Sequence, residues 1–147
     1  MPSDFTAPNP DYVQRVRDSI AHQPFMSRLL GTLVERVAPG RVELSLPLAP
    51  DLLQPYANVH GTVATALADS AAGYAAQTLL GPAADVVTVE YKVNFLAPGV
   101  GTRLYASGTV LRAGRTLYVC EARVEVITDT TRKDIAHMLT TMMVVAG

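Results

Sequence analysis

The segment from residue 54 to residue 76 carries a single carboxylate, Asp69, among side chains that are almost all small or apolar. Stripping water from an ionised group is costly, so an apolar helix excludes aspartate unless the charge has a partner or a task. A carboxylate set apart in this way can act as a nucleophile or as a general base. Asp69 is therefore the first residue to which we assign chemistry.

Polar and flexible residues lie shortly before Asp69. Gly61 stands where a helix should begin, so its N–H and the positive end of the helix dipole can face an oxygen that becomes negative. The carboxamide of Gln54 can both donate and accept a hydrogen bond. His60 allows two interpretations, a direct chemical role and a role in shaping the entry to the helix. Together these residues indicate a polarising site next to the acid.

Two helices are predicted from the pattern of apolar residues. Residues 58–80 are helix-sized, rich in alanine, nearly free of charge and followed by Gly81-Pro82, which predicts a buried central helix. Residues 10–30 carry apolar side chains at helical spacing, with Pro10 near the start and Pro24 near the end. They predict one amphipathic N-terminal helix.

The rest of the chain has the pattern of β-strands. Residues 30–37 and 41–48 flank Pro39-Gly40 and predict a hairpin. Three or four further runs lie within residues 86–96, 102–111, 116–127 and 135–145, with short connections at Pro98-Gly99, Ala113-Gly114 and Asp129-Thr130. Short connections predict that consecutive runs are antiparallel neighbours. One apolar helix among about five to six antiparallel strands is an α+β layout in which the sheet must wrap around the helix.

Length and composition favour one domain, residues 1–147, in a self-associating protein. Of the 147 residues 49% are hydrophobic and 17% charged, more apolar surface than a lone domain of this size comfortably hides. Burial between identical subunits would account for the surplus. A net charge of −1 without any run of Lys or Arg argues against nucleic acid and anionic membranes as partners.

Compartment and metal content follow from a few residue types. The N-terminal residues show no signal-peptide pattern, no apolar run is long enough to span a bilayer, and a single cysteine, Cys120, fits a reducing compartment. We therefore expect a cytoplasmic protein in which Cys120 packs in the core. His22, His60 and His137 lack the spacing of metal ligands, so we expect no metal and no cofactor.

Four motifs together point to a known family. They are Gln54-x5-His60-Gly61, Ala-Leu-Ala-Asp69-Ser-Ala-Ala-Gly73, Val89-x5-Phe95-Leu-Ala-Pro98-x2-Gly101 and Ala113-Gly-Arg115. In order and spacing the chain resembles the hotdog-fold acyl-CoA thioesterases, in particular the branch of the phenylacetate-pathway and 4-hydroxybenzoyl-CoA thioesterases. The resemblance implies a hotdog fold and a homodimer, often a dimer of dimers, with active sites at the dimer interface.

The chain departs from the pattern of this family at two positions. The usual His-Gly-Gly is His60-Gly61-Thr62 here, and the Ser or Thr that many relatives carry one helical turn after the acid is replaced by Gly73. A hydroxyl that orients water must then come from elsewhere. Thr88 matches the position where some relatives place one, although a β-branched residue in a strand needs no further explanation.

The resemblance implies hydrolysis of an acyl-CoA thioester with a small aromatic or a short to medium acyl group, and CoA enters as part of this substrate. A thiol of pKa about 8.5 leaves readily, so one carboxylate and one oxyanion site suffice. Asp69 would act as nucleophile or general base, the Gly61 amide would polarise the carbonyl, and Gln54 would bind the carbonyl or the water. We expect further substrate contacts from Asn58, Thr62 and Gly73, and phosphate contacts from Arg112 and Arg115.

The spacing of these groups constrains the site. If the helix includes His60, nine residues place Asp69 on the opposite face from it. His60 and Gly61 of one chain then cannot easily meet Asp69 of the same chain on one substrate. This predicts a composite site, with Gly61 and Gln54 from one subunit and Asp69 from the other.

Two other functions are compatible with the predicted fold. A hotdog hydratase or dehydratase needs a His paired with an acid, and no such motif is visible. A non-catalytic acyl-CoA sensor could use the same pocket, but the chain retains Asp69 and has no segment long enough for a DNA-binding domain. Thioester hydrolysis is the preferred prediction.

Overall fold

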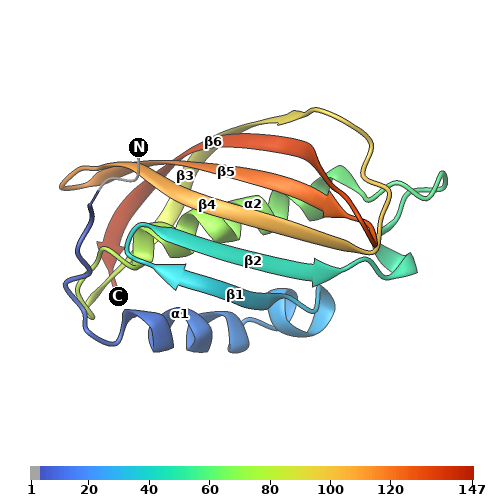
Figure 1. The fold of residues 1–147 in the computed structure, drawn as a ribbon. Helices are drawn as coiled ribbons and strands as arrows, with labels where there is room; N and C mark the ends of the chain where they lie inside the picture. Colours follow the sequence, from blue (N-terminus) through green and yellow to red (C-terminus); the bar gives the residue numbers. More distant parts are fainter. Residues whose placement is uncertain (1–3) are drawn as a thin grey trace.

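The computed structural model describes residues 4–147, so the first three residues of the expected domain 1–147 lie outside the described residues. One antiparallel sheet of six strands curves around a central helix, α2, and a shorter helix, α1, lies beside β1 (Figure 1). The helices are α1 (Tyr12–Ala21), α2 (Gly61–Gln77), a π-helical turn η1 (Phe25–Leu29) and a 3-10 turn η2 (Pro50–Leu52). The strands are β1 (Leu33–Ala38), β2 (Arg41–Pro47), β3 (Ala84–Phe95), β4 (Arg103–Ala113), β5 (Leu117–Ile127) and β6 (Arg132–Ala146). The predicted α+β layout is confirmed.

Helix α2 begins at Gly61, as the sequence predicts for the glycine, but His60 lies before it rather than inside it. His60 has an extended backbone, with φ −63° and ψ 130°, and its Nδ1 accepts a hydrogen bond from the Thr62 N–H at 3.3 Å. It is therefore the N-cap of the helix. The Gly61 N–H is at the first helical position, where an α-helix offers no acceptor of its own.

Helix α2 packs against β4 at unusually short range. A Cβ on Gly108 of β4 would lie 2.2 Å from the carbonyl carbon of Ala71 and 2.4 Å from the nitrogen of Ala72. Glycine in a strand interior marks such a close backbone approach. The small side chains on both elements thus explain the alanine-rich composition of α2, whose Ala68, Ala71 and Ala75 are fully buried.

The sheet order corrects one expectation from the sequence. The strands run in the order β1-β2-β4-β5-β6-β3, so β3 pairs with β6 at one edge and does not pair with its chain neighbour β4. The connection through Pro98-Gly99 does not turn back on itself, because it docks on the segment before α2, where the Val59 N–H donates to the Gly99 carbonyl at 2.8 Å. The other expected hairpins, β1–β2, β4–β5 and β5–β6, are confirmed.

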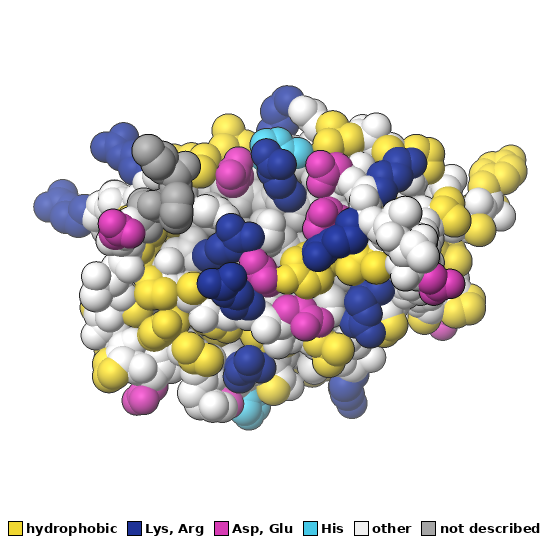
Figure 2. Space-filling model, viewed as in Figure 1, with side chains coloured by type: hydrophobic (Ala, Val, Ile, Leu, Met, Phe, Trp, Pro, Cys, Tyr) yellow, Lys and Arg dark blue, Asp and Glu magenta, His cyan; other side chains and the backbone are white. Residues whose placement is uncertain are grey.

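The outer face of the sheet carries charged side chains of both signs among hydrophobic and uncharged ones (Figure 2). Arg132 and Glu125 lie 2.7 Å apart, Arg41 and Glu43 lie 2.9 Å apart, and all four are at least partly exposed. Exposed pairs of this kind add little stability but keep a surface hydrated. None of the helices within residues 4–147 has both the length and the hydropathy needed to cross a bilayer.

Candidate active site

Asp69 lies near the middle of α2 on the wall of a cavity of about 420 Å³, here called the Asp69 cavity. One face of α2, the end of α1 and the first residues of β3 form its walls. The volume is within the range of about 300–1,000 Å³ that is usual for small-molecule sites. The lone acid of the sequence therefore faces a space that can hold part of a ligand.

Thr88 of β3 holds the carboxylate of Asp69. Its Oγ1 donates to Asp69 Oδ1 at 2.8 Å. Burial raises the pKa of the Asp69 carboxyl above its ordinary value, and the hydrogen bond from Thr88 opposes this by lowering it. Asp69 is half-buried and Thr88 is exposed, so the cavity opens along the free edge of β3. The threonine that the sequence favoured as a plain strand residue is thus a partner of the acid.

A second cavity, of about 510 Å³, lies at the start of α2 and is here called the Gly61 cavity. Gln54 and Asn58 line it from the loop before the helix, and Phe95 lines it from the end of β3. Gly61 leaves room for this ring, because a Cβ there would lie 2.9 Å from the Phe95 Cζ. The nearest partner of the Gln54 carboxamide is the Val59 carbonyl at 3.5 Å, a weak contact that leaves the amide available to a ligand.

The two cavities share no lining residue, so one chain does not bring Gly61 and Asp69 together. The reason differs from the one expected. With His60 outside the helix, Gly61 and Asp69 are eight residues apart, so they point about 80° apart around the helix axis and not to opposite faces. They are separated along the helix axis instead, by roughly 12 Å at 1.5 Å per residue.

The remaining predicted site residues have separate surroundings. Gly73 lines the Asp69 cavity one turn after the acid. Thr62 is exposed and belongs to the helix cap, since its Oγ1 lies 2.6 Å from His60 Nδ1. Arg112 and Arg115 are exposed beside the β4–β5 turn and line neither cavity.

The N-terminal segment forms part of the Asp69 cavity, which sequence reasoning missed. Ser19 of α1, with His22 and Gln23 just after it, lines the cavity, as does Gln77 at the end of α2. A signal for Gln77 was present, because it follows Asp69 by two helical turns in an otherwise apolar helix.

The described residues support neither a cysteine nucleophile nor a metal site. Cys120 is buried in β5, and burial raises the pKa of its thiol to about 12, which keeps it neutral. Within residues 4–147 no three side chains of His, Cys, Asp or Glu are grouped so that they could hold a metal ion.

Comparison with known proteins decides the family. The family model described as "Thioesterase superfamily" matches residues 56–133, more than half of the chain. The chain belongs to the thioesterase superfamily. It is a thioester hydrolase, and its curved sheet around α2 is the hotdog fold.

Relatives cover most of this thioesterase. A thioesterase family protein from Silicibacter pomeroyi is 42% identical with a TM-score of 0.89, covering 92% of this chain and 99% of that one. A candidate esterase of Halobacterium salinarum is 35% identical over 106 residues, 69% of this chain and 70% of that protein. The E. coli PaaI protein from the phenylacetic acid degradation operon shares the fold, with a TM-score of 0.80 at 18% identity and coverage of 92% and 95%.

Proposed function

We propose that this thioesterase hydrolyses an acyl-CoA with a small aromatic or a short to medium acyl group, releasing the free acid and CoA. The observation that carries the proposal is the carboxylate of Asp69, held by Thr88 at 2.8 Å on the wall of a ligand-sized cavity. A thioesterase needs one group to attack or to activate water, and Asp69 is a carboxylate that combines partial burial, a raised pKa and an open cavity.

Each group has a role that follows from its chemistry. Asp69 attacks the thioester carbonyl or takes a proton from the attacking water, and Thr88 positions the carboxylate. The Gly61 N–H, with the helix dipole behind it, binds the carbonyl oxygen as negative charge develops there. Gln54 adds a second polar contact from the same cavity. The thiolate of CoA leaves without protonation because its pKa is low, about 8.5.

Because Asp69 and Gly61 are in different cavities of one chain, the proposal requires a second copy. Strand β3 is the surface on which we expect the second copy to bind. It is a twelve-residue strand at the edge of the sheet and carries exposed apolar side chains. Val89, Tyr91 and Phe95 are 53%, 47% and 57% exposed. Long apolar edges of this kind are normally covered. Antiparallel pairing of β3 with a second β3 would cover them and add a shared sheet.

The positions of the cavities along β3 suggest the register of this pairing. Thr88 lines the Asp69 cavity and Phe95 lines the Gly61 cavity, seven residues further along the strand and roughly 23 Å away. Because the bulge between Thr88 and Glu90 adds one residue to the strand, a two-fold axis through Lys92 brings Thr88 of one subunit opposite the partner's Phe95, with both side chains on the helix-facing side of the sheet. Each Asp69 cavity then adjoins the Gly61 cavity of the other subunit, which completes two equal sites.

Two measurements test the proposal. The first follows the release of free CoA from a panel of acyl-CoAs, with binding measured in parallel. Turnover that Asp69→Asn abolishes without loss of binding supports the enzyme, whereas saturable binding without any turnover supports a sensor.

The second measurement mixes two inactive variants, Asp69→Asn and Gly61→Pro, after unfolding and refolding them together. In a composite dimer, half of the refolded dimers are mixed and each has one intact site, so about a quarter of wild-type activity returns. If both groups act from one chain, the mixture stays inactive and the composite site is wrong.

A further inference from the structure

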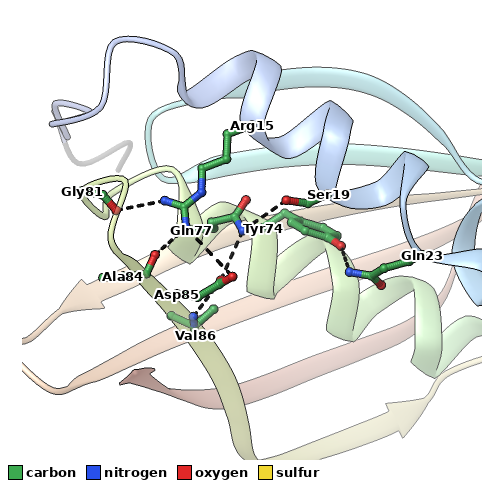
Figure 3. Close-up of polar contacts among 9 residues, drawn as sticks. All are labelled: Arg15, Ser19, Gln23, Tyr74, Gln77, Gly81, Ala84, Asp85 and Val86. Carbon is green, nitrogen blue, oxygen red and sulfur yellow. Dashed lines mark hydrogen bonds and ion pairs between the residues drawn. The ribbon is translucent and has the colours of Figure 1, made fainter. Parts of the chain in front are cut away.

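The end of the Asp69 cavity that is remote from Asp69 is formed by three segments that polar contacts tie together (Figure 3). Asp85, at the start of β3, lines this end with Gln77 of α2 and Ser19 of α1. Asp69 and Asp85 are the two carboxylates on the walls, and no Lys or Arg belongs to the described lining. The fixed charge that a ligand meets at the remote end is therefore negative.

The carboxylate of Asp85 is held in place and is still open to the cavity. Its Oδ1 accepts a hydrogen bond from the Val86 N–H at 2.8 Å and another from Gln77 Nε2 at 3.2 Å (Figure 3). Its Oδ2 accepts no hydrogen bond within residues 4–147, and the side chain is 45% exposed. The two hydrogen bonds fix the position of the charge without covering it.

Arg15 pairs with Asp85 from outside the cavity. Its guanidinium donates to the Gly81 carbonyl at 3.0 Å and to the Ala84 carbonyl, and its Nη2 lies 3.9 Å from Asp85 Oδ2. An ion pair at this distance, without a hydrogen bond and with one partner half exposed, is weak. Because Arg15 also does not line the cavity, it does not replace the negative charge there with a positive one.

The charge of Asp85 is felt at another wall of the cavity, at Tyr74 of α2. The hydroxyl of Tyr74 accepts a hydrogen bond from Gln23 Nε2 (Figure 3). Burial, and then the charge of Asp85, raises the pKa of Tyr74 to about 12. A negative charge that disfavours a phenolate at this place also disfavours any other anion in the same space.

The same charge determines which half of an acyl-CoA can lie at the remote end. The phosphates of CoA are repelled by a space that two carboxylates and no cation line. The groove outside α1 that shares Ser19 and His22 with the cavity adds Asp11 and Asp18 against one cation, Arg15. The acyl group is therefore the half of the substrate that fits.

We propose that Asp85 is a specificity-determining residue that excludes acyl groups ending in a negative charge and admits neutral ones of the same size. Proteins discriminate by placing unfavourable charges against the wrong ligand as well as by contacts with the right one. The proposal rests on the function proposed above. Asp85 precedes Thr88, the partner of Asp69, by three residues of β3, or roughly 10 Å. This distance sets the length of the acyl group on which the charge acts.

The test compares matched pairs of straight-chain acyl-CoAs in the full-length enzyme. One member of each pair ends in a carboxylate and the other in the carboxamide, which has nearly the same shape but no charge. Chains of about six to ten carbons cover the roughly 10 Å to Asp85. Release of CoA is followed at about pH 8, above the ordinary histidine pKa of about 6.5, because His22 also lines the cavity.

The carboxamide should be the better substrate of each pair. We expect its kcat/KM to exceed that of the carboxylate by roughly a hundredfold or more, because the carboxylate both loses water and meets Asp85. The loss of water would disfavour the carboxylate in any cavity. The part of the ratio that belongs to Asp85 is therefore measured with variants.

Asp85→Asn removes the charge but keeps an acceptor for Val86 and Gln77, and it should reduce the ratio by roughly tenfold. Asp85→Glu keeps the charge and should keep most of the ratio. Asp51→Asn removes the same charge at an exposed position of η2 that does not line the cavity, and should leave the ratio as it is. Should Asp85→Asn fail to fold, the wild-type ratio must narrow between about 0.05 M and about 0.5 M salt, since salt screens partly exposed charges.

The possible failures can be told apart. Equal rates for both members of every pair overturn the charge selection and leave the thioesterase proposal intact. A ratio that is unchanged in Asp85→Asn, or that falls equally in Asp85→Glu, also overturns it. Turnover of other acyl-CoAs but of neither member of any pair overturns this inference alone. Release of CoA from no acyl-CoA overturns the proposed function and this inference with it.

Discussion

The Asp69 cavity and the Gly61 cavity lie along the same helix and the same edge strand, yet they offer opposite chemistry. The first holds an ionisable acid with a positioned hydroxyl, under the cover of the N-terminal helix. The second holds the Gly61 N–H at the start of α2 beside the exposed aromatic ring of Phe95. In the proposed function the attacking group belongs to the first cavity and the group that polarises the carbonyl belongs to the second. The difference then means that the proposed chemistry is divided between two places that a single chain keeps apart.

Removing the acid should have the largest effect. Asp69→Asn keeps the shape of the side chain and an acceptor for Thr88, but it cannot act as a base or a nucleophile. We expect kcat for CoA release to fall on the order of a hundred- to ten-thousandfold. A variant that keeps more than a tenth of wild-type turnover would show that the Asp69 cavity does not supply the attacking group.

The same variant should not lose stability. Because burial raises the pKa of Asp69, the folded state disfavours its charge at neutral pH, a penalty that begins as pH rises through the unfolded value and is complete above the folded one. The neutral Asn removes that penalty. The thermal midpoint at neutral pH, measured by circular dichroism, should therefore equal or exceed that of the wild type.

Removing the backbone N–H of Gly61 should cause the second-largest loss of activity. Gly61→Pro deletes the N–H at a helix position that proline favours, and the extended His60, with ψ 130°, is what a residue before proline requires. Losing one such donor costs about 2.7–4 kcal/mol of barrier, or about a hundred- to a thousandfold in kcat.

Gly61→Ala is the matched control for the proline variant. It adds a carbon and keeps the N–H, and Gly61 is not among the residues whose positive φ demands glycine. The three atoms nearest to the new Cβ belong to the ring of Phe95, the far end of a side chain and not backbone. We expect Gly61→Ala to retain at least ten times the activity of Gly61→Pro. Equal losses would mean that Gly61 contributes space rather than a donor.

Separating the subunits should disable both cavities together. In the proposed register Tyr91→Lys points a positive charge to the helix-facing side of the shared sheet, opposite the partner's Val93, and an inward-pointing charge on an edge strand opposes pairing. We expect a monomer in sedimentation at micromolar concentration and at least a tenfold loss of activity that high protein concentration partly restores. Leu33→Lys makes a similar change on the other edge strand, β1, where Leu33 is 51% exposed, and should preserve the dimer. A fully active monomer would overturn the divided site.

Removing the hydroxyl of Thr88 should have the smallest effect on activity. Asp69 must be ionised to act, so activity falls as pH drops through its pKa. The hydrogen bond from Thr88 lowers that pKa, so Thr88→Val should raise it and move the acidic limb of the kcat profile to higher pH. We also expect a loss of about tenfold in kcat at neutral pH. Thr88→Ser keeps a hydroxyl and should restore the wild-type limb. A limb that does not move would leave Thr88 with a structural role.

Elements governed by local patterns could be predicted from the sequence. The alanine-rich run with Gly61 at its start predicted the central helix, and short turns predicted three hairpins, two of them at glycines and the third at Asp129-Thr130. The position of β3 could not be predicted in this way. It depends on the Pro98-Gly99 connection docking on the segment before α2, a contact between residues about forty apart.

The candidate site was predictable to the same extent. Asp69 stood out because it is a lone charge in an apolar helix. Thr88 was a candidate only through the family resemblance, and its hydrogen bond with Asp69 depends on the packing of β3 against α2. The part played by Ser19 and Gln23 was hidden for the same reason, because α1 reaches the cavity through tertiary packing and carries no sequence signal for it. Gln77 was the exception, since its place on the Asp69 face of α2 can be counted along the chain.

The short distance between the backbone of α2 and Gly108 of β4 limits how this enzyme can be adapted to new substrates. Since the backbones of α2 and β4 already touch, the helix cannot retreat to enlarge the Asp69 cavity from that side. Room for a longer or wider acyl group has to come from the N-terminal helix, which closes the opposite wall through only a few side chains. Diversification of substrate range, in evolution or by engineering, should therefore concentrate in α1 and the turn after it, while the sheet-facing side of α2 stays fixed.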